Sequence, residues 1–319
     1  MRQYAEPREV EAAQVGQGAS RVDDCHSPPH LVGNGFRCKV LLMLTDSIVE
    51  AFDEAAHTYD QVGVSFFGPF GAELVRRAGV KQAERVLDVG CGRGAVLFPA
   101  ARAVGPEGHV TGTDAATTMV DLTGAEAARR GLRHVAVAVG DAQEPAFPAG
   151  SFDVVTAGLV VFMLPDPHAA LRAYARVLRP GGRLALSCFA SQDPAFGRAM
   201  RALAGHLPAG AEPPPTPDPM FASAEATLAA VADAGFGEVT STEFSAVSRF
   251  RDAEHWLAWC WSHGARALLR RIPVDQLPAA TADASAAMWG GGGRGGELSM
   301  TTTIRAVVAT APDHPDRDA

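Results

Sequence analysis

The sequence lacks any apolar run that could cross a membrane. Its longest uninterrupted apolar stretches, such as Val40–Leu44, are far shorter than the ~20 residues that a spanning helix needs. The amino-terminal sequence MRQYAEPREVEAAQ also lacks the apolar core of a secretory signal. We therefore expect a cytoplasmic protein with no membrane partner.

Cysteine is scarce, and an excess of positive charge is missing. The five cysteines are odd in number and form no CxxC pair, so we expect neither a disulfide framework nor a metal site. Lysine and arginine total 28 against 36 acidic residues, which gives a net charge of -8. This balance argues against a broad basic surface for nucleic acid. What is present is a globular composition with 47% hydrophobic and 20% charged residues.

The two ends of the chain carry little structural pattern. Residues 1–42 mix Gly, Ser, Pro, Asp and His without a period, so we expect a disordered or weakly docked extension. Met43 resembles a natural protein start. The polar tail over residues 311–319 is expected to be flexible. Residues 43–310 are expected to form the folded domain.

Apolar strands alternate with helices from residue 85 onward. Strands are predicted over residues 85–89, 109–113, 134–139, 152–157, 183–188, 237–244 and 298–310. Because helices separate the first five, they form βαβ units and a mostly parallel sheet with helices on both faces. A further helix is predicted over residues 48–59. The segments around 190–235 and 252–296 are expected to form a helical cap over the substrate.

A glycine-rich loop follows the first strand in the run Val86-Leu87-Asp88-Val89-Gly90-Cys91-Gly92-Arg93-Gly94. Glycines let the backbone approach a ligand, and the next helix offers free N–H groups. The pattern also fits a dinucleotide loop, because Ala95 completes G-x-G-x-x-A. Asp88 distinguishes a dinucleotide loop from a loop that binds S-adenosylmethionine (SAM). A carboxylate about 4 Å from a pyrophosphate costs about 4 kcal/mol at an effective dielectric constant near 20. SAM carries an ammonium and a sulfonium instead, which Asp88 suits.

This run resembles the first motif of the class I SAM-dependent methyltransferases, in particular the ubiquinone/menaquinone-biosynthesis type that acts on small molecules. Four further motifs follow in order: Val110-Thr111-Gly112-Thr113-Asp114, Gly140-Asp141-Ala142, Ser151-Phe152-Asp153-Val154-Val155, and Leu178-Arg179-Pro180-Gly181-Gly182-Arg183-Leu184. The resemblance covers roughly residues 45–190. It implies a Rossmann-like α/β fold with seven strands and SAM as the cofactor.

The same resemblance implies roles for individual residues. Asp114 would hold the ribose hydroxyls, Asp141 would accept from the adenine amine, and the Ala142 N–H would meet the ring. Cys91 is interpreted as a small loop residue and not as a reactive thiol. The expected cofactor-binding residues are Tyr59, Asp88, Gly90, Cys91, Gly92, Asp114, Ala115, Met119, Asp141, Ala142 and Ala157.

The sequence departs from this family after the fourth strand. Relatives often carry paired histidines there, before Pro-Asp-Pro, whereas this chain has Phe162 and Met163 before Pro165-Asp166-Pro167. The departure removes an obvious general base and predicts an apolar wall facing the substrate.

A tryptophan-rich stretch offers the remaining candidates. Trp256, Trp259 and His263 are spaced by three and four residues, which predicts one shared helical face. That face either seals the cap against the sheet or forms an aromatic substrate wall with His263 as base or orienting donor. His255 is the second catalytic candidate. The expected substrate-binding residues are Phe66, Phe162, Met163, Trp256 and Trp259.

These observations favour methyl transfer to a small, mainly apolar or aromatic acceptor, on oxygen, carbon or nitrogen. The Ala-, Arg- and Gly-rich composition suggests a GC-rich bacterial source and a role in secondary metabolism. Three alternatives remain open: a SAM-fold protein that binds or rearranges a ligand without methylating it, a nicotinamide-dependent oxidoreductase, and a nucleic-acid methyltransferase. The aromatic cap also leads us to expect a homodimer.

Overall fold

The computed structural model describes residues 48–212, 217–290 and 298–312. The predicted extension over residues 1–42 lies outside this part of the chain, as does the tail beyond residue 312. Within it, no helix reaches the length and apolarity that a membrane crossing requires.

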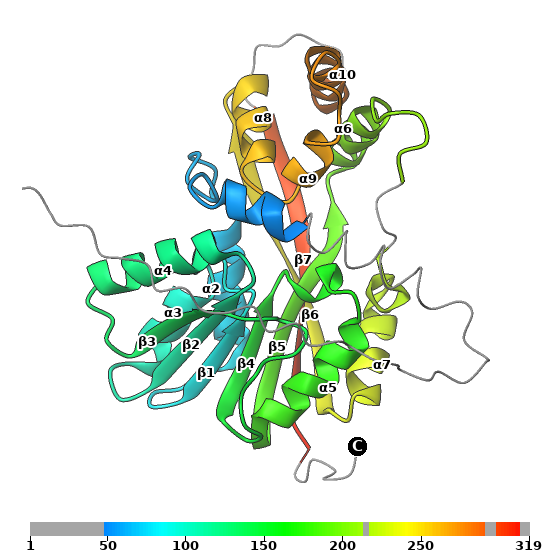
Figure 1. The fold of residues 1–319 in the computed structure, drawn as a ribbon. Coiled ribbons are helices and arrows are strands. Elements are labelled where there is room, and N and C mark those ends of the chain that lie inside the picture. Colours follow the sequence, from blue (N-terminus) through cyan, green and yellow to red (C-terminus); the bar gives the residue numbers. More distant parts are fainter. Residues whose placement is uncertain (1–47, 213–216, 291–297, 313–319) are drawn as a thin grey trace, which may run out of the picture. The chain divides into compact units, whose positions relative to one another are not determined.

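A seven-stranded sheet forms the centre of the fold, in the order β3-β2-β1-β4-β5-β7-β6 (Figure 1). The first five strands run parallel, whereas β7 is antiparallel to both β5 and β6. The predicted seven-stranded, mostly parallel sheet is thus confirmed. The strands are β1 (Arg85–Val89), β2 (His109–Asp114), β3 (Val135–Val139), β4 (Phe152–Gly158), β5 (Leu178–Gln192), β6 (Gly237–Phe250) and β7 (Leu298–Thr310).

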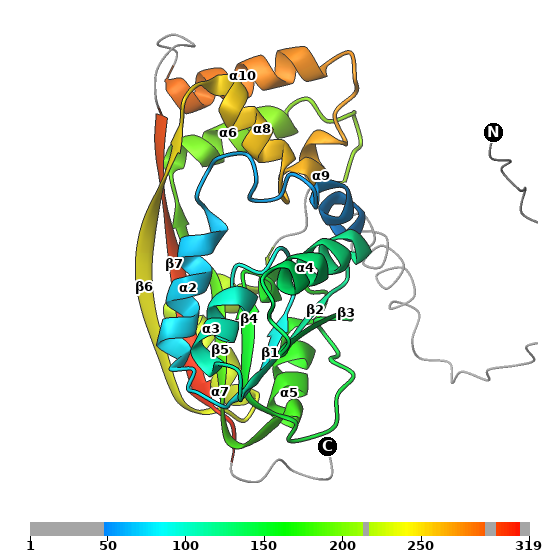
Figure 2. The same ribbon diagram turned by 90° about the vertical axis from the view of Figure 1, so that its left-hand side faces the viewer.

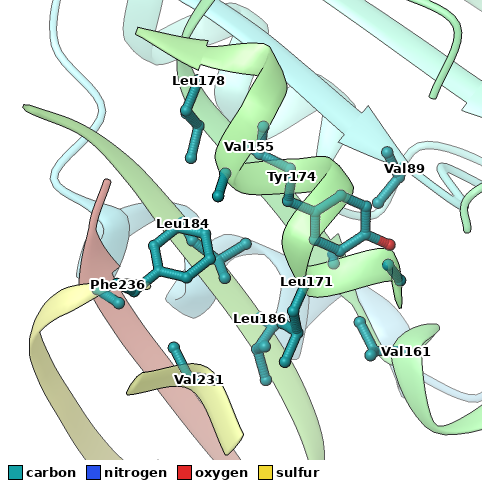
Figure 3. Close-up of a cluster of buried hydrophobic side chains, with 14 of the residues drawn as sticks. Val89, Val155, Val161, Leu171, Tyr174, Leu178, Leu184, Leu186, Val231 and Phe236 are labelled. Atoms are coloured by element: carbon teal, nitrogen blue, oxygen red, sulfur yellow. The ribbon is translucent and has the colours of Figure 1, made fainter. Parts of the chain in front are cut away.

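Helices cover both faces of the sheet because successive strand side chains point to opposite sides. Val154 packs with the helices α2 (Phe67–Ala78), α3 (Leu97–Val104) and α4 (Thr117–Arg129). Its neighbour Val155 packs on the other face with α5 (Pro167–Val177) and α7 (Ala224–Asp233). Figure 3 shows this second core, in which Leu171 and Tyr174 of α5 meet Leu184 and Leu186 of β5.

Four further helices form a cap beyond the carboxyl ends of the parallel strands. They are α6 (Pro194–Ala204), α8 (Ala253–Trp261), α9 (Arg266–Leu269) and α10 (Leu277–Trp289). Figures 1 and 2 show β6 and β7 continuing past the rest of the sheet to reach them. A separate apolar core, which includes Leu203, Trp256 and Met288, joins the cap to the ends of these strands. Of the segment 190–235, α6 lies in this cap, whereas α7 packs on the sheet.

Two strands are longer than their sequences predict. β5 continues to Gln192 instead of ending at residue 188, and β6 continues to Phe250 instead of residue 244. Both extensions pair with β7, in a register that ends at Phe250 opposite Leu298. In contrast, the helix that begins the described chain ends at residue 55 and not at residue 59. A chain of turns follows, in which Asp60 has a φ of 55°.

Candidate functional site

The glycine loop between β1 and α3 borders a small cavity of about 40 Å³. Gly90 and Gly92 have φ angles of 63° and 48°, which favour glycine. A Cβ on Gly90 would lie only 2.6 Å from Cγ2 of Val160. Backbone and packing therefore both require glycine here. This small cavity is lined by Tyr59, Phe67, Phe70, Gly71, Asp88, Gly90, Cys91, Gly92, Arg93, Ala95, Val96, Gly158, Leu159 and Ser187.

Asp88 places a buried carboxyl group in the wall of the small cavity. Its Oδ1 accepts a hydrogen bond from Oγ1 of Thr156 at 2.8 Å, while its buried Oδ2 has no partner. Burial raises the pKa of Asp88 to about 7, and the nearby Asp114 adds to this rise, whereas the Thr156 hydrogen bond and the nearby Leu97 backbone N–H oppose it. An unpaired carboxyl oxygen in this position suits a cationic group of a ligand.

Asp114 ends β2 and ties the glycine loop to it. One of its oxygens accepts from the Gly92 N–H at 2.8 Å, and the other accepts from the Ala116 N–H at 3.0 Å. Burial raises the pKa of Asp114, and these backbone hydrogen bonds oppose the rise. A carboxylate has further lone pairs, so Asp114 can still accept from ligand hydroxyls.

The remaining cofactor candidates lie outside the small cavity. Asp141 is exposed after β3 and accepts from the Gln143 N–H at 2.7 Å. Ala142 is buried, and its carbonyl accepts from the Tyr174 hydroxyl at 2.7 Å. Met119 is buried on α4, whereas Ala115 is exposed before that helix. Ala115 and Met119 follow the carboxyl end of β2, where Asp114 lies, and Asp141 and Ala142 follow the carboxyl end of β3.

Ala157 does not line the small cavity. Its side chain is fully buried in the core that faces α5, because strand alternation directs it away from the loop. Gly158 and Leu159 line the small cavity in its place. Leu159 has a φ of 56°, a conformation that costs a non-glycine residue energy and that clusters at functional sites. Its N–H donates to Oγ of Ser187, which also lines the cavity.

Cys91 is placed as the sequence interpretation expects. Its side chain is buried, and its N–H donates to the Thr113 carbonyl at 2.9 Å. Burial holds the pKa of the thiol well above its ordinary range. Because the thiolate is the reactive form, this cysteine has a structural role in the loop.

A larger cavity of about 350 Å³ lies between the sheet and the cap. This size falls within the range of small-molecule sites. Its walls come from the segment over residues 48–67, from the segment after β4, from the ends of β5 and β7, and from the cap. It is lined by Ile48, Phe52, Tyr59, Phe66, Phe67, Leu159, Phe162, Met163, Phe189, Gln192, Phe196, Met200, Trp259, His263, Gly264, Ala265, Met300 and Thr302.

Three residues line both cavities and separate them: Tyr59, Phe67 and Leu159. The rings of Tyr59 and Phe67 are stacked, with centroids 4.5 Å apart. Burial raises the pKa of Tyr59 well above its ordinary value, so this phenol stays protonated. A ligand in the small cavity and one in the large cavity would therefore meet at this aromatic wall.

Four of the five expected substrate residues line the large cavity: Phe66, Phe162, Met163 and Trp259. Trp256 does not line the large cavity. Trp256 is fully buried inside the cap, where its ring lies 6.2 Å from that of Trp289. Trp256 meets Trp289 of α10, whereas Trp259 lines the cavity.

The two candidate histidines differ in their surroundings. His255 does not line the large cavity; its Nε2 bonds the Val62 carbonyl at 2.8 Å, and its Nδ1 accepts from the Arg251 N–H at 3.3 Å. Both ring nitrogens of His255 are therefore used by the backbone. His263 lines the cavity beyond the end of α8, with its ring 4.1 Å from that of Trp259.

Sequence reasoning missed much of the cavity wall. Phe189 and Gln192 come from β5, Met300 and Thr302 from β7, and Phe196 and Met200 from α6. The apolar residues after β5 were a usable signal, because parallel strands present their carboxyl ends to ligands. Those from β7 carried no signal, since their position depends on pairing with a distant strand. In the described ranges no group of three or more His, Cys, Asp or Glu residues could hold a metal ion.

Comparison with known proteins agrees with this geometry. Residues 86–182 match the family described as a methyltransferase domain. Nocamycin O-methyltransferase of Saccharothrix syringae is 40% identical over 251 residues, which cover 73% of this chain and 87% of that protein. Aklanonic acid methyltransferase of Streptomyces sp. strain C5 is 49% identical over 140 residues, which cover 44% of this chain and 64% of that protein.

A solved structure supports the fold. The YcgJ protein of Bacillus subtilis superimposes with a TM-score of 0.52 at 20% identity, covering 76% of this chain and 99% of that one. The family match and the long alignment to an O-methyltransferase show that this chain belongs to the class I SAM-dependent small-molecule methyltransferases.

Proposed function

We propose that this enzyme methylates an acidic oxygen, such as a carboxylate, on a small and largely apolar or aromatic acceptor of secondary metabolism. One observation carries the proposal. Among the described residues that line the large cavity, no side chain is able to take up a proton near neutral pH. An acceptor that is already ionised needs no such group.

The titratable side chains in this lining are Tyr59 and His263. Burial lowers the pKa of His263 to about 3, so its ring is neutral and only weakly basic. Tyr59 is protonated because burial raises its pKa. Neither residue can act as an effective general base, for which a pKa near the working pH is needed.

The small cavity fits the charged end of SAM. The unpartnered Oδ2 of Asp88 offers a site for the ammonium, and Gly92, whose Cβ position meets only Tyr59 at 3.8 Å, leaves room for close backbone approach. Asp114 would accept from the ribose hydroxyls. When bound, SAM supplies an activated methyl group, and the acceptor oxygen forms the new C–O bond as the C–S bond breaks and its electron pair stays on sulfur.

The protein's own contribution is then to position the reactants and to exclude water. The stacked Tyr59 and Phe67 and the strained Leu159 hold the wall between the two cavities. Well-oriented reactants gain up to roughly 7–11 kcal/mol from such positioning. A carboxylate acceptor becomes a neutral ester, and the step releases no proton that the protein must bind.

The side chains that line the large cavity indicate the polarity of the acceptor. Most lining side chains are aliphatic or aromatic, with Gln192, Thr302 and His263 as polar exceptions besides the Tyr59 hydroxyl. The relatives are named for nocamycin and for aklanonic acid, and the second name is that of an acid. Aklanonic acid is therefore the first natural compound to test.

The proposal is tested with three acceptors on one apolar frame: 2-naphthoate, 2-naphthol and 2-naphthylamine. With SAM at saturating concentration, we expect 2-naphthoate to be methylated at a rate that is flat between pH 6 and 8, measured by mass spectrometry. Any turnover of 2-naphthol should rise about tenfold per pH unit, because the phenol must ionise without help. Turnover of 2-naphthol or 2-naphthylamine at pH 7 that equals turnover of 2-naphthoate would contradict the proposal.

A further inference from the structure

We infer that His263 is a fixed hydrogen-bond donor to an oxygen of the acceptor, one that selects oxygenated acceptors over plain hydrocarbons. The inference rests on the proposed function only in taking the large cavity as the acceptor site. It assigns His263 the opposite role from a general base, because the donated proton stays on the ring.

The local backbone determines which nitrogen of His263 carries the proton. Nδ1 accepts a hydrogen bond from the Ala265 N–H at 3.2 Å. A neutral imidazole has one N–H and one acceptor nitrogen. Since Nδ1 is the acceptor, the proton is on Nε2.

The Nε2–H of His263 is buried and has no partner within the described protein. Buried polar groups are nearly always paired, because an unpaired donor loses its hydration without replacement. The side chain also lines the large cavity. A ligand oxygen is therefore the partner that this donor lacks.

The ring is held in place and kept neutral. It packs against Trp259 at 4.1 Å and meets the edge of Phe67 at 6.3 Å, both of which line the same cavity. Burial is the cause that lowers its pKa, and no charged neighbour contributes. A neutral, immobilised donor presents its proton in one direction across the working pH range.

His255 shows what a purely structural histidine looks like in this cap. It is buried to a similar extent, but both of its ring nitrogens bond to the backbone, at Val62 and Arg251. His263 bonds the backbone through one nitrogen only. The contrast assigns the free N–H of His263 to ligand recognition.

For a carboxylate acceptor the consequence is an orientation. One carboxylate oxygen receives the hydrogen bond from His263, and the other is left to attack the methyl group. A carbonyl oxygen on a different acceptor would be bound in the same way. A hydrocarbon of the same shape would leave the buried donor unpaired.

The test measures binding and needs no methyl transfer. The probes are 1-tetralone and tetralin, a ketone and a hydrocarbon on the same frame, titrated in the presence of S-adenosylhomocysteine by ligand-observed NMR. We expect the wild type to bind 1-tetralone at least tenfold more tightly than tetralin, the ratio typical of one hydrogen bond. The His263→Phe variant should lose this preference, and His263→Gln, which keeps an N–H donor, should retain most of it.

Gln192→Met is the matched control, since it removes a different polar group from the same cavity and should leave the preference intact. If His263 had only a structural role, His263→Phe would lower the affinity for both probes equally and leave the ratio of the two affinities unchanged. The inference fails if His263→Phe keeps the preference, or if Gln192→Met abolishes it. Because 1-tetralone has no acidic group, these outcomes are independent of whether carboxylates are the substrates.

Discussion

At the scale of single residues, Gly90 shows how tightly the cofactor loop is specified. Its φ of 63° disfavours any side chain, and Val160 occupies the space that a Cβ would need. Gly79 has a similar φ of 59° at the end of α2, but nothing lies within 4 Å of its Cβ position. Comparing substitutions at these two glycines therefore separates the cost of backbone strain from the cost of a steric clash.

We predict that Gly90→Ala destabilises the protein more than Gly79→Ala. Both substitutions incur the left-handed penalty of roughly 1–2 kcal/mol, and Gly90→Ala adds an overpacking cost of about 1–3 kcal/mol against Val160. Urea unfolding of the two variants measures the difference. The double variant Gly90→Ala/Val160→Ala should recover part of the loss, and equal destabilisation by the two single substitutions would contradict the clash.

Local motifs made the cofactor loop predictable from sequence. The other residues that line its cavity could not be predicted in this way. Asp88 and Gly90 lie in one short run whose residue types match the ligand. Leu159 and Ser187 complete the same cavity, but Leu159 follows β4 and Ser187 lies within β5. An ordinary leucine at a positive φ has no sequence signature, because its conformation is imposed by the surrounding packing.

At the scale of elements, the helix over residues 48–55 is attached to the cofactor side of the fold. Asp53 accepts from both the N–H and the hydroxyl of Thr118, in the first turn of α4. Arg93, in the glycine loop, donates to the Ala56 carbonyl at 2.6 Å. These bonds hold the segment that carries Tyr59 against both cavities.

We predict that Asp53→Ala loosens this segment. The substitution removes a cap-like acceptor from the first turn of α4, which costs about 1 kcal/mol. It should also weaken the binding of S-adenosylhomocysteine several-fold, because Tyr59 is no longer held over the small cavity. Calorimetric titration measures the affinity, and hydrogen exchange over residues 48–60 measures the loosening.

Glu54 supplies the control for this change. It lies next to Asp53 but pairs with Arg266 and Arg270 in half-exposed ion pairs, which contribute little to stability. Glu54→Ala should leave the affinity for S-adenosylhomocysteine near that of the wild type. If both variants bind alike, the Asp53 contact does not position the segment.

Element boundaries in the second half of the chain escaped sequence reasoning for a physical reason. β6 extends to Phe250 through alternating polar residues, and its continuation is determined by pairing with β7. α8 ends at Trp261, so the helical spacing that links Trp256 to Trp259 does not extend to His263. His263 lines the cavity from the turn after the helix and not from the helical face that the spacing predicts.

At the scale of the whole molecule, Asp88 couples folding stability to function. Burial raises its pKa to about 7 in the folded protein, whereas an unfolded aspartate titrates near 3.9. The folded state therefore binds this proton more tightly than the unfolded state does. The stabilising contribution of the protonated form is complete below about pH 4 and is lost as the pH rises to about 7.

We predict that Asp88→Asn makes the unliganded protein more stable at pH 8. The asparagine oxygen can still accept from Thr156, and the variant avoids a buried charge, so the gain in the free energy of unfolding is up to about 4 kcal/mol. The gain should shrink toward zero near pH 4, where the wild-type carboxyl is protonated. Urea unfolding of both proteins across this pH range measures it.

The same substitution should damage cofactor binding, because the cost of the buried carboxylate is recovered only when a cation faces it. SAM should bind Asp88→Asn at least tenfold more weakly at pH 7, and its affinity for the wild type should fall roughly tenfold from pH 7 to pH 5.5 as Asp88 takes up a proton. The variant's affinity should stay flat over that range. A variant that is more stable at pH 8 yet binds SAM as well as the wild type would show that Asp88 is strained but does not meet the ammonium. A variant with no gain in stability would show that the carboxylate is not costly to bury.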